Sequence, residues 1–371
     1  MLVGVPKEVK NHEYRTGLLP SSAAELIKHG HKVIAETKCG DGAGFSDNDY
    51  INLGVEICKT AEEIFERADM IVKVKEPQPQ ERKMLREGQI LFTYLHLAPD
   101  LEQTQDLVDS GAICIAYETV TSPVGGLPLL APMSEVAGRL SIQAGAHSLE
   151  KVNGGRGVLL GGVPGTGSSK VTIIGGGIVG VNAAVIALGM GARVFIFDNN
   201  INTLRTLESR FGSAIETMFS NHSNLQRHVL DSDLVIGGVL IPGAVAPKLV
   251  TKEMISEMKA GSVVVDVAID QGGCFATSKP TTHEKPTYKV DDVVHYCVTN
   301  MPGMTPRTSS IALNNVTLPF AINLANKGYV QALKDDPHFA DGLNVHKGEI
   351  TCKAVALAQN IAYRPVSEIV N

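Results

Sequence analysis

The chain has 371 residues, more than twice the ~150 of an average domain, so its length predicts two domains. Hydrophobic residues make up 44% and charged residues 19%, a composition that excludes an intrinsically disordered chain. Lys and Arg minus Asp and Glu gives 33 − 39 = −6, which argues against a protein that grips nucleic acid or an anionic membrane by charge. We therefore expect neither nucleic acid nor a membrane as a partner.

The six cysteines include no CxxC pair and no metal-ligand spacing, which indicates free thiols in a reducing compartment. Lys7, Glu8 and Lys10 stand where a signal peptide would need its apolar core. We therefore expect a cytoplasmic protein without a bound metal.

The first 130 residues alternate short apolar runs with amphipathic segments. The apolar runs predict strands within residues 2–6, 32–36, 70–77, 89–97 and 112–118. The segments between them predict helices within residues 21–30, 62–68 and 101–111. This βαβα order is typical of a largely parallel sheet covered by helices.

A connecting helix is predicted over residues 134–152, with Ser134 as its N-cap after Pro132. A second series of strands and helices then begins, and its six predicted strands are those starting near residues 171, 193, 214, 233, 263 and 295. After Arg307 the pattern is mostly helical, notably over residues 314–328 and 350–363, and offers no further strand-rich domain. We expect this tail to pack back on the first domain.

The fold class predicted from this order is α/β with two domains. One is a doubly wound Rossmann-type nucleotide-binding domain at residues 130–306. The other is a discontinuous α/β substrate domain at residues 1–129 and 307–371.

A glycine turn marks the expected nucleotide site. Gly175, Gly177 and Gly180 follow the run VTII and open a helix, and Asp198 ends the next strand 23 residues after Gly175. The glycines permit a tight turn and close approach of the backbone to a pyrophosphate, and the acid can accept hydrogen bonds from ribose hydroxyls. A 2′-phosphate would meet like charge at Asp198, so NAD is favoured over NADP.

Two other interpretations of this region are weaker. Residues 161–170 have the glycine spacing of an ATP-binding P-loop, but Ser168 stands where the lysine must be. Residues 171–192 carry no charge and are long enough to span a membrane, but the three glycines interrupt them.

Three residues at the ends of apolar segments are candidates for substrate chemistry: Arg15, Lys75 and His96. Each also has a structural interpretation: Arg15 as a solvated loop charge, Lys75 as a lysine that guards a strand edge, and His96 as a buried core histidine. Lys73 shares a face with Lys75 by period-two alternation. Lys75 is preferred because it lies nearer the carboxyl end of its strand, where open α/β sheets bind ligands.

The chain resembles the alanine dehydrogenase family, which includes the NAD-binding subunit of proton-translocating transhydrogenase. The resemblance runs nearly end to end, through GVPKEVKNHEYR, VKVKEP, YLHLAPDLEQT, LLAPMSEVAGRLS, GGGIVG, VVVDVAIDQGGC and TNMPGMTPRTSS. It implies NAD-dependent oxidative deamination of L-alanine to pyruvate and ammonia. It also implies a two-domain subunit that forms a homo-oligomer, usually a hexamer.

By this resemblance His96, Asp270 and Lys75 take catalytic positions, and Arg15 and Lys75 bind the substrate. Arg15 suits a carboxylate, Lys75 a reacting carbonyl, and His96 a proton transfer near neutral pH. Asp270 is expected to orient ammonia or water. The implied cofactor contacts are Ser134, Gly175, Gly177, Ile178, Val179, Gly180, Asp198, Thr203, Ser220, Val239, Leu240, Val267, Ala268, Ile269, Asp270, Lys279, Val298, Thr299, Asn300 and Met301.

Two other functions fit parts of the pattern. A transhydrogenase-type subunit binds NAD in the same fold but passes hydride to a second nucleotide. A non-catalytic NAD-binding homologue would keep the glycine turn without turnover. The set Arg15, Lys75 and His96 favours the dehydrogenase over both.

Overall fold

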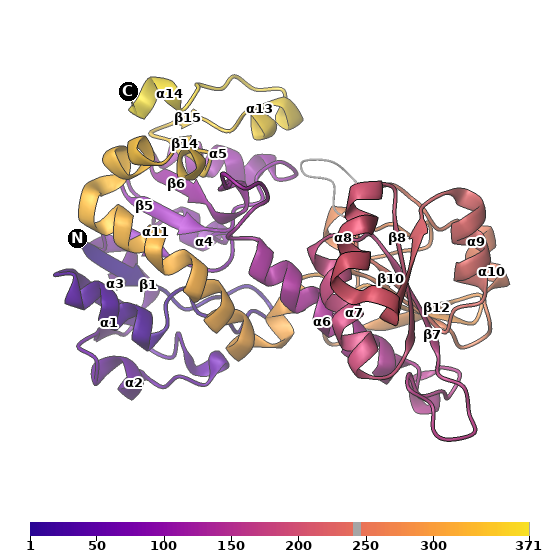
Figure 1. Cartoon of the computed structure of the whole chain (residues 1–371). Helices are drawn as coiled ribbons and strands as arrows, with labels where there is room; N and C mark the ends of the chain where they lie inside the picture. Colours follow the sequence, from indigo (N-terminus) through magenta and orange to yellow (C-terminus); the bar gives the residue numbers. More distant parts are fainter. Residues whose placement is uncertain (240–245, 371) are drawn as a thin grey trace. The chain divides into compact units, whose positions relative to one another are not determined.

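The computed structural model describes residues 1–239 and 246–370. The chain forms two compact units, one of Met1–Met133 with Gly303–Asn371 and one of Ser134–Pro302 (Figure 1). The first unit is thus built from both ends of the chain. Both units are α/β, which confirms the predicted fold class.

An eight-stranded sheet forms the centre of the first unit, in the order β15-β14-β6-β5-β4-β1-β2-β3. Its strands are β1 (Leu2–Val5), β2 (Lys32–Glu36), β3 (Glu56–Cys58), β4 (Met70–Val72), β5 (Ile90–Thr93), β6 (Ile113–Ala116), β14 (Leu343–His346) and β15 (Glu349–Ile350). The six strands from β6 to β3 are parallel. The carboxyl ends of β1, β4, β5 and β6 therefore meet at one edge of the sheet.

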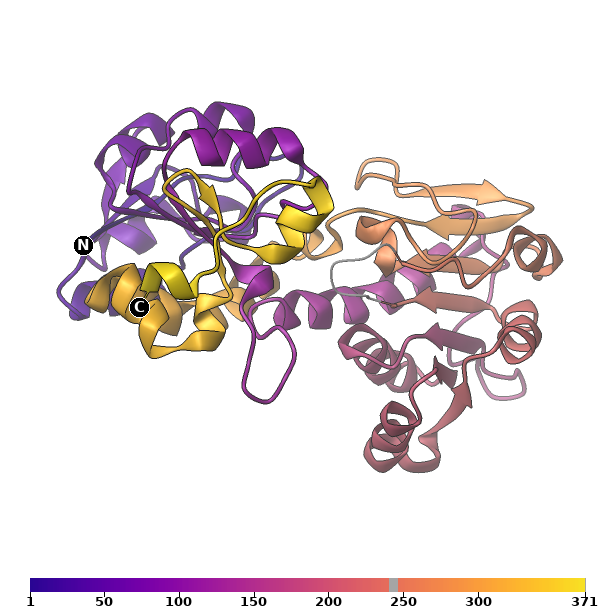
Figure 2. The same cartoon turned by 90° about the horizontal axis from the view of Figure 1, so that it is seen from above.

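Helices cover both faces of this sheet, and each face has its own apolar core. One core packs α1 and α11 on the sheet, through residues such as Leu26 and Leu313. The other packs α3, α5 and α13, through residues such as Phe65 and Leu107. Figure 2 shows the orange helix α11 and the purple helix α5 on opposite sides. The helices are α1 (Pro20–Lys28), α2 (Asp47–Ile51), α3 (Ala61–Arg67), α4 (Pro79–Arg82), α5 (Leu101–Asp109), α11 (Pro306–Asp335), α12 (Pro337–Ala340), α13 (Lys353–Gln359) and α14 (Ser367–Val370).

The tail after Arg307 differs from the sequence pattern. It does pack on the first unit, but it also contains the two strands β14 and β15, where the pattern was mostly helical. Lys347 and Gly348 connect them with φ of 46° and 90°. Two consecutive positive φ angles are typical of a two-residue hairpin turn, and the helical pattern around these residues does not predict it.

A seven-stranded sheet forms the second unit, in the order β12-β13-β11-β10-β7-β8-β9. Its strands are β7 (Lys170–Ile174), β8 (Arg193–Asp198), β9 (Ile215–Phe219), β10 (Leu234–Gly237), β11 (Val263–Asp266), β12 (Thr287–Val290) and β13 (Val293–Tyr296). Six are parallel and match the six predicted strands, whereas the antiparallel edge strand β12 was not predicted. The order reverses between β7 and β10, and dinucleotides bind at such a point in doubly wound sheets.

The second unit contains most of α6 (Ala131–Ser148), whose first three residues belong to the first unit, and the helices α7 (Ile178–Gly189), α8 (Ile201–Phe211), α9 (His222–Leu230) and α10 (Lys252–Glu257). Helix α6 begins three residues earlier than predicted, so Ser134 lies inside it and is not its N-cap. Pro132 sits in the first turn, where a missing N–H costs no helical hydrogen bond. Within the described part of the chain, no helix is long and apolar enough to cross a membrane.

Candidate active site

The predicted substrate residues of the first unit come together at the carboxyl edge of its sheet. Arg15 follows β1, Lys75 follows β4 and His96 follows β5, and these three strands are neighbours. The chain after β4 is joined to the chain after β5 by the Tyr94 N–H donating to the Val74 carbonyl at 3.2 Å. The Thr93 hydroxyl also donates to the Lys75 carbonyl at 2.9 Å.

Arg15 is buried, with 2% of its surface exposed, so it is not a solvated loop charge. Glu13 accepts hydrogen bonds from Arg15 Nε at 2.7 Å and Nη2 at 2.5 Å, and from the Arg15 backbone N–H at 3.1 Å. Arg15 Nη1 lies 3.0 Å from Met133 Sδ. Burial disfavours the Arg15 cation, but the Glu13 carboxylate outweighs it and raises the pKa of Arg15. The guanidinium is thus charged and fixed in one plane.

Lys73 and Lys75 do not share a face of a strand, because β4 ends at Val72. The Glu8 carboxylate pulls the chain into a bend by accepting the N–H groups of Val74 at 2.6 Å and Lys75 at 3.3 Å. Lys75 is also no edge lysine, since β4 lies between β5 and β1.

Lys73 is fully buried beneath this bend and bonded to two carboxylates. Its Nζ lies 3.2 Å from Glu8 Oε2 and 2.7 Å from Glu81 Oε1. Burial raises the pKa of Glu8, and the nearby Glu81 and Glu13 charges add to the rise while Lys73 opposes it. Sequence analysis missed this triad, because buried charges at positions 8, 73 and 81 leave no periodic signal.

His96 lies on a turn after β5 and is exposed, so it is not a buried core histidine. Its φ is 52°, in the left-handed region that few non-glycine residues adopt. Its ring stacks on that of Tyr94, with centroids 5.8 Å apart. The Glu118 carboxylate, just after β6, accepts the His96 N–H at 2.6 Å.

The predicted nucleotide site lies at the carboxyl edge of the second sheet. Gly175 has φ of 104°, and Gly177 is the N-cap of α7 without a side-chain acceptor for the first N–H groups. A Cβ on Gly180 would lie 1.8 Å from the Gly175 carbonyl oxygen, whereas a Cβ on Gly177 would meet nothing within 4 Å. The turn therefore packs tightly on its inner side and leaves space at the helix N-terminus, which fits a diphosphate.

Asp198 ends β8 beside this turn. Its Oδ2 accepts the Gly176 N–H at 2.9 Å and its Oδ1 accepts the Asn200 N–H at 2.8 Å. Each carboxylate oxygen has a second lone pair, so ribose hydroxyls can still bind. Asp198 thus also stabilises the glycine turn, a role that sequence analysis did not assign to it.

Most other expected cofactor residues also follow parallel strands of this sheet. Ser220 follows β9, Val239 follows β10, and Val298, Thr299, Asn300 and Met301 follow β13. Thr203 lies on α8, next to Gly176, and Lys279 lies on an exposed loop. Leu240 lies outside the described residues.

Asp270 is exposed on a short 3-10 helix, Val267–Gln271, that also carries Val267, Ala268 and Ile269. The fully buried Asp266 precedes it and accepts hydrogen bonds from the Ala268 N–H at 3.2 Å, the Cys274 N–H at 2.9 Å and the Ser278 hydroxyl at 2.5 Å. Asp266 therefore ties both ends of the segment that carries Asp270. Asp266 lies in the run VVVDVAID, but its role was not predicted from the sequence.

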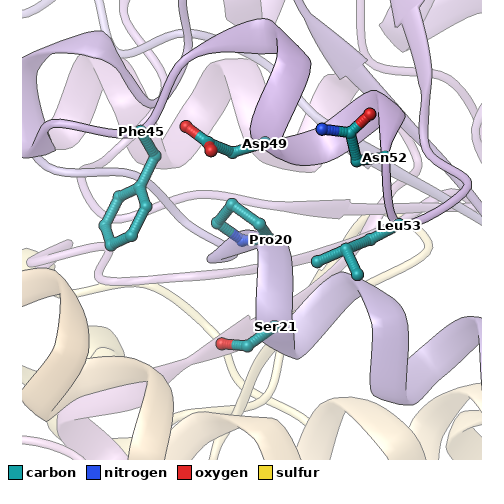
Figure 3. A pocket seen from close by; sticks show the side chains of 6 residues that line it. All are labelled: Pro20, Ser21, Phe45, Asp49, Asn52 and Leu53. Carbon is teal, nitrogen blue, oxygen red and sulfur yellow. The ribbon is translucent and has the colours of Figure 1, made fainter.

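A hollow in the first unit lies beside α1 and α2 and is lined by Pro20, Ser21, Phe45, Asp49, Asn52 and Leu53 (Figure 3). None of the predicted site residues lines it.

Comparison with known proteins identifies the family of this chain. Residues 4–137 match the family described as alanine dehydrogenase/PNT, N-terminal domain, and residues 141–353 match its C-terminal domain. An alanine dehydrogenase of Halomonas elongata is 57% identical over 370 residues, covering all of both chains.

Solved structures give the same result. One titled L-alanine dehydrogenase superimposes with a TM-score of 0.94 at 51% identity, covering 97% of this chain and 99% of the other. A transhydrogenase from Sinorhizobium meliloti has a TM-score of 0.81 at 23% identity, covering 95% and 100%, and shows the shared fold alone. The chain therefore belongs to the alanine dehydrogenase/PNT family across both of its units.

Proposed function

We propose that this chain is an alanine dehydrogenase that catalyses the NAD-dependent, reversible oxidative deamination of L-alanine to pyruvate and ammonia. The observation that carries the proposal is that Arg15, Lys75 and His96 follow three adjoining strands, β1, β4 and β5, at one edge of the sheet. The high identity to the alanine dehydrogenase of Halomonas elongata over the whole chain supports it.

Arg15 binds the substrate carboxylate in this proposal. Glu13 binds Nε and Nη2 and so fixes the plane of the guanidinium, which can then donate charge-assisted hydrogen bonds to the substrate carboxylate. Lys75 donates a hydrogen bond to the oxygen of pyruvate and polarises its carbonyl. Glu8 fixes the backbone of Lys75 from below.

His96 moves the proton. Oxidation of the amine makes an iminium that water must attack, so a base is needed in one direction and an acid in the other. An exposed imidazole can serve as both, and its stacking on Tyr94 limits its rotation. Asp270, in the second unit, is proposed to orient ammonia or water.

Members of this family use a nicotinamide cofactor, and we propose NAD. The bound nicotinamide would take hydride from the Cα of alanine. Gly175, Gly177, Ile178, Val179 and Gly180 would hold its diphosphate and Asp198 its ribose. A 2′-phosphate would face the like charge of the Asp198 carboxylate, which accepts hydrogen bonds from the N–H groups of Gly176 and Asn200.

The domain assignments and the wider setting are part of the same proposal. Residues 1–129 and 307–371 form the substrate domain and residues 130–306 the NAD domain. We infer a cytoplasmic homohexamer; all six cysteines are free, which is typical of a reducing compartment. Light scattering of the purified protein measures the number of subunits.

The test is NADH absorbance with L-alanine and NAD, then with pyruvate, ammonium and NADH, each repeated with the phosphorylated cofactor. We expect turnover in both directions with a preference for NAD. A wild-type chain that oxidises no L-alanine would overturn the proposal, and transfer of hydride to a second nucleotide would favour the transhydrogenase reaction.

The residue roles are tested in the same assay. His96→Ala should lower kcat by ~10²–10⁴-fold with NADH binding retained, as expected for loss of an acid–base group. Lys75→Ala should also raise KM for pyruvate. His29→Ala and Lys83→Ala, exposed residues of the same unit, are the matched controls. Wild-type kcat in His96→Ala would exclude its role.

A further inference from the structure

The turn that carries His96 draws its backbone hydrogen bonds from side chains of other segments. Leu95 and Leu97 are buried on either side of His96, with 0% and 2% of their surfaces exposed. The Leu95 carbonyl accepts from Gln103 Nε2 at 2.6 Å, and the Leu97 carbonyl accepts from Gln359 Nε2 at 2.7 Å. Regular sheet pairing ends at Thr93, and the Asp100 N–H also donates to the Leu97 carbonyl at 2.9 Å, so these side chains and one backbone group together hold the turn.

The N–H side of this turn depends on one carboxylate. Glu118 Oε1 accepts the His96 N–H at 2.6 Å and the Leu95 N–H at 3.1 Å, while Oε2 lies 3.2 Å from the same Leu95 nitrogen. Hydrogen bonds to an ionised acceptor are stronger than those to a neutral one. Two consecutive N–H groups are therefore held by one carboxylate.

The left-handed backbone at His96 needs such support. A φ near 52° is uncommon for residues other than glycine, and hydrogen bonds to the surrounding structure help to hold it. Without an acceptor for its N–H, the backbone would relax toward a common conformation. The relaxation would turn the Cα–Cβ bond and carry the imidazole away from its stack on Tyr94.

Glu118 is itself well anchored. It follows the fully buried Tyr117, whose hydroxyl donates to the Lys73 carbonyl at 3.0 Å and whose ring packs edge-on against Tyr94. The carboxylate, the stacking ring and the segment before Lys75 thus form one packed group.

We propose that Glu118 is a positioning residue of the dehydrogenase, acting through His96 by holding the backbone that aims the imidazole. This inference rests on the proposed function for its kinetic consequence. Its structural part, the holding of the two N–H groups, does not.

The kinetic test compares Glu118→Ala and Glu118→Gln with the exposed control Glu66→Gln, using the full-length protein. Because a displacement near 1 Å can cost ~10²-fold, we expect Glu118→Ala to lower kcat by about 10–100-fold. KM for pyruvate should change by less than about threefold, since Arg15 and Lys75 lie on other segments. Glu118→Gln keeps the length and one acceptor oxygen, so it should recover part of the rate.

A double-mutant cycle separates positioning from general support of the fold. In a His96→Ala background, Glu118→Ala should change the residual rate by less than about twofold, because the group it positions is gone. An equal loss in both backgrounds would overturn the proposal. So would a full-rate Glu118→Ala enzyme.

Hydrogen exchange gives a measurement that needs no turnover. The amides of Leu95 and His96 should exchange faster in Glu118→Ala than in the wild type, and Glu118→Gln should lie between them. Unchanged exchange would overturn the proposal even in an active enzyme. If the wild type lacks alanine dehydrogenase activity but these amides respond, the proposed function fails and the structural part stands.

Discussion

The two candidate sites are built from different kinds of chemical groups. In the first unit, each predicted substrate residue stands beside a carboxylate: Arg15 on Glu13, Lys75 on Glu8 and His96 on Glu118. In the second unit, the nucleotide edge consists mainly of glycine backbone and the N-terminus of α7. Charged side chains therefore shape the first site, whereas glycines, which leave the backbone accessible, shape the second.

The difference follows from what each site is proposed to hold. A small amino or oxo acid offers a carboxylate and a carbonyl, which only a few correctly aimed charges can fix. A dinucleotide offers a long diphosphate that a backbone can approach closely. The first site should therefore be sensitive to substitutions that remove a charge but keep the side-chain volume. The second site should be sensitive to substitutions that add volume but no charge.

The largest effect is expected from Lys73→Met, which removes charge from the first unit while keeping most of the volume. Glu8 and Glu81 would be left buried without their cation, a change that typically costs about 3–5 kcal/mol. Calorimetry of the purified protein measures the lowered melting temperature.

The matched control for that change is the triple variant Lys73→Met, Glu8→Gln and Glu81→Gln. It removes the unpaired charges and should recover much of the loss. A Lys73→Met protein as stable as the wild type would show that the first unit does not depend on this buried charge, and would contradict the contrast drawn between the two sites.

A smaller loss of stability is expected from Gly180→Ala, which adds volume to the second unit without charge. The new Cβ would overlap the Gly175 carbonyl at 1.8 Å, and such overpacking costs about 1–3 kcal/mol. NADH affinity, measured by fluorescence titration, should fall because the turn must shift. Gly189→Ala in the same helix meets nothing within 4 Å and should leave NADH affinity intact.

The smallest effect is a difference in response to pH. Burial lowers the pKa of His228 and of His295 below 6.5 in the second unit. Each histidine therefore binds a proton more readily in the unfolded chain than in the folded one. The contribution of the neutral histidines to the free energy of unfolding is present above pH 6.5 and is lost as the pH falls below it. The loss is at most about 1.4 kcal/mol per pH unit for each histidine.

The raised pKa of Glu8 acts in the opposite direction in the first unit. There the folded state binds the proton more readily, so acidification through the pKa of Glu8 toward 4.5 adds stability. Hydrogen exchange measured at several pH values should show the second unit losing protection around His228 as the pH falls below 6.5. His228→Gln should reduce that loss, and an equal loss in this variant and the wild type would contradict the assignment.

Much of this architecture could be predicted from residue patterns. The glycine turn and the alternating runs that led to β1, β2, β7 and β8 depend on local periodicity and backbone freedom, which neighbouring residues determine. The placement of Arg15, Lys75 and His96 followed from the ends of such runs and from the family resemblance.

The rest depends on contacts distant in sequence. The Lys73 ammonium binds the carboxylate of Glu8, 65 residues away in the sequence, and the His96 N–H donates to the carboxylate of Glu118, 22 residues away. Strand β12 pairs only along the edge of a sheet that other segments build. Local patterns carry no trace of such partners, so these carboxylates became visible only in the folded structure.

The discontinuity of the first unit has a consequence for synthesis on the ribosome. Its core joins Leu26 near the start of the chain to Leu313 and Leu324 on α11, and Thr16 and Leu19 donate backbone N–H groups to Ser310 and Asn314. The second unit is continuous and complete once its last strand emerges. We therefore expect the second unit to fold first. The apolar strands at the start of the first unit stay exposed, and open to binding by chaperones, until the C-terminal part of the chain has been synthesised.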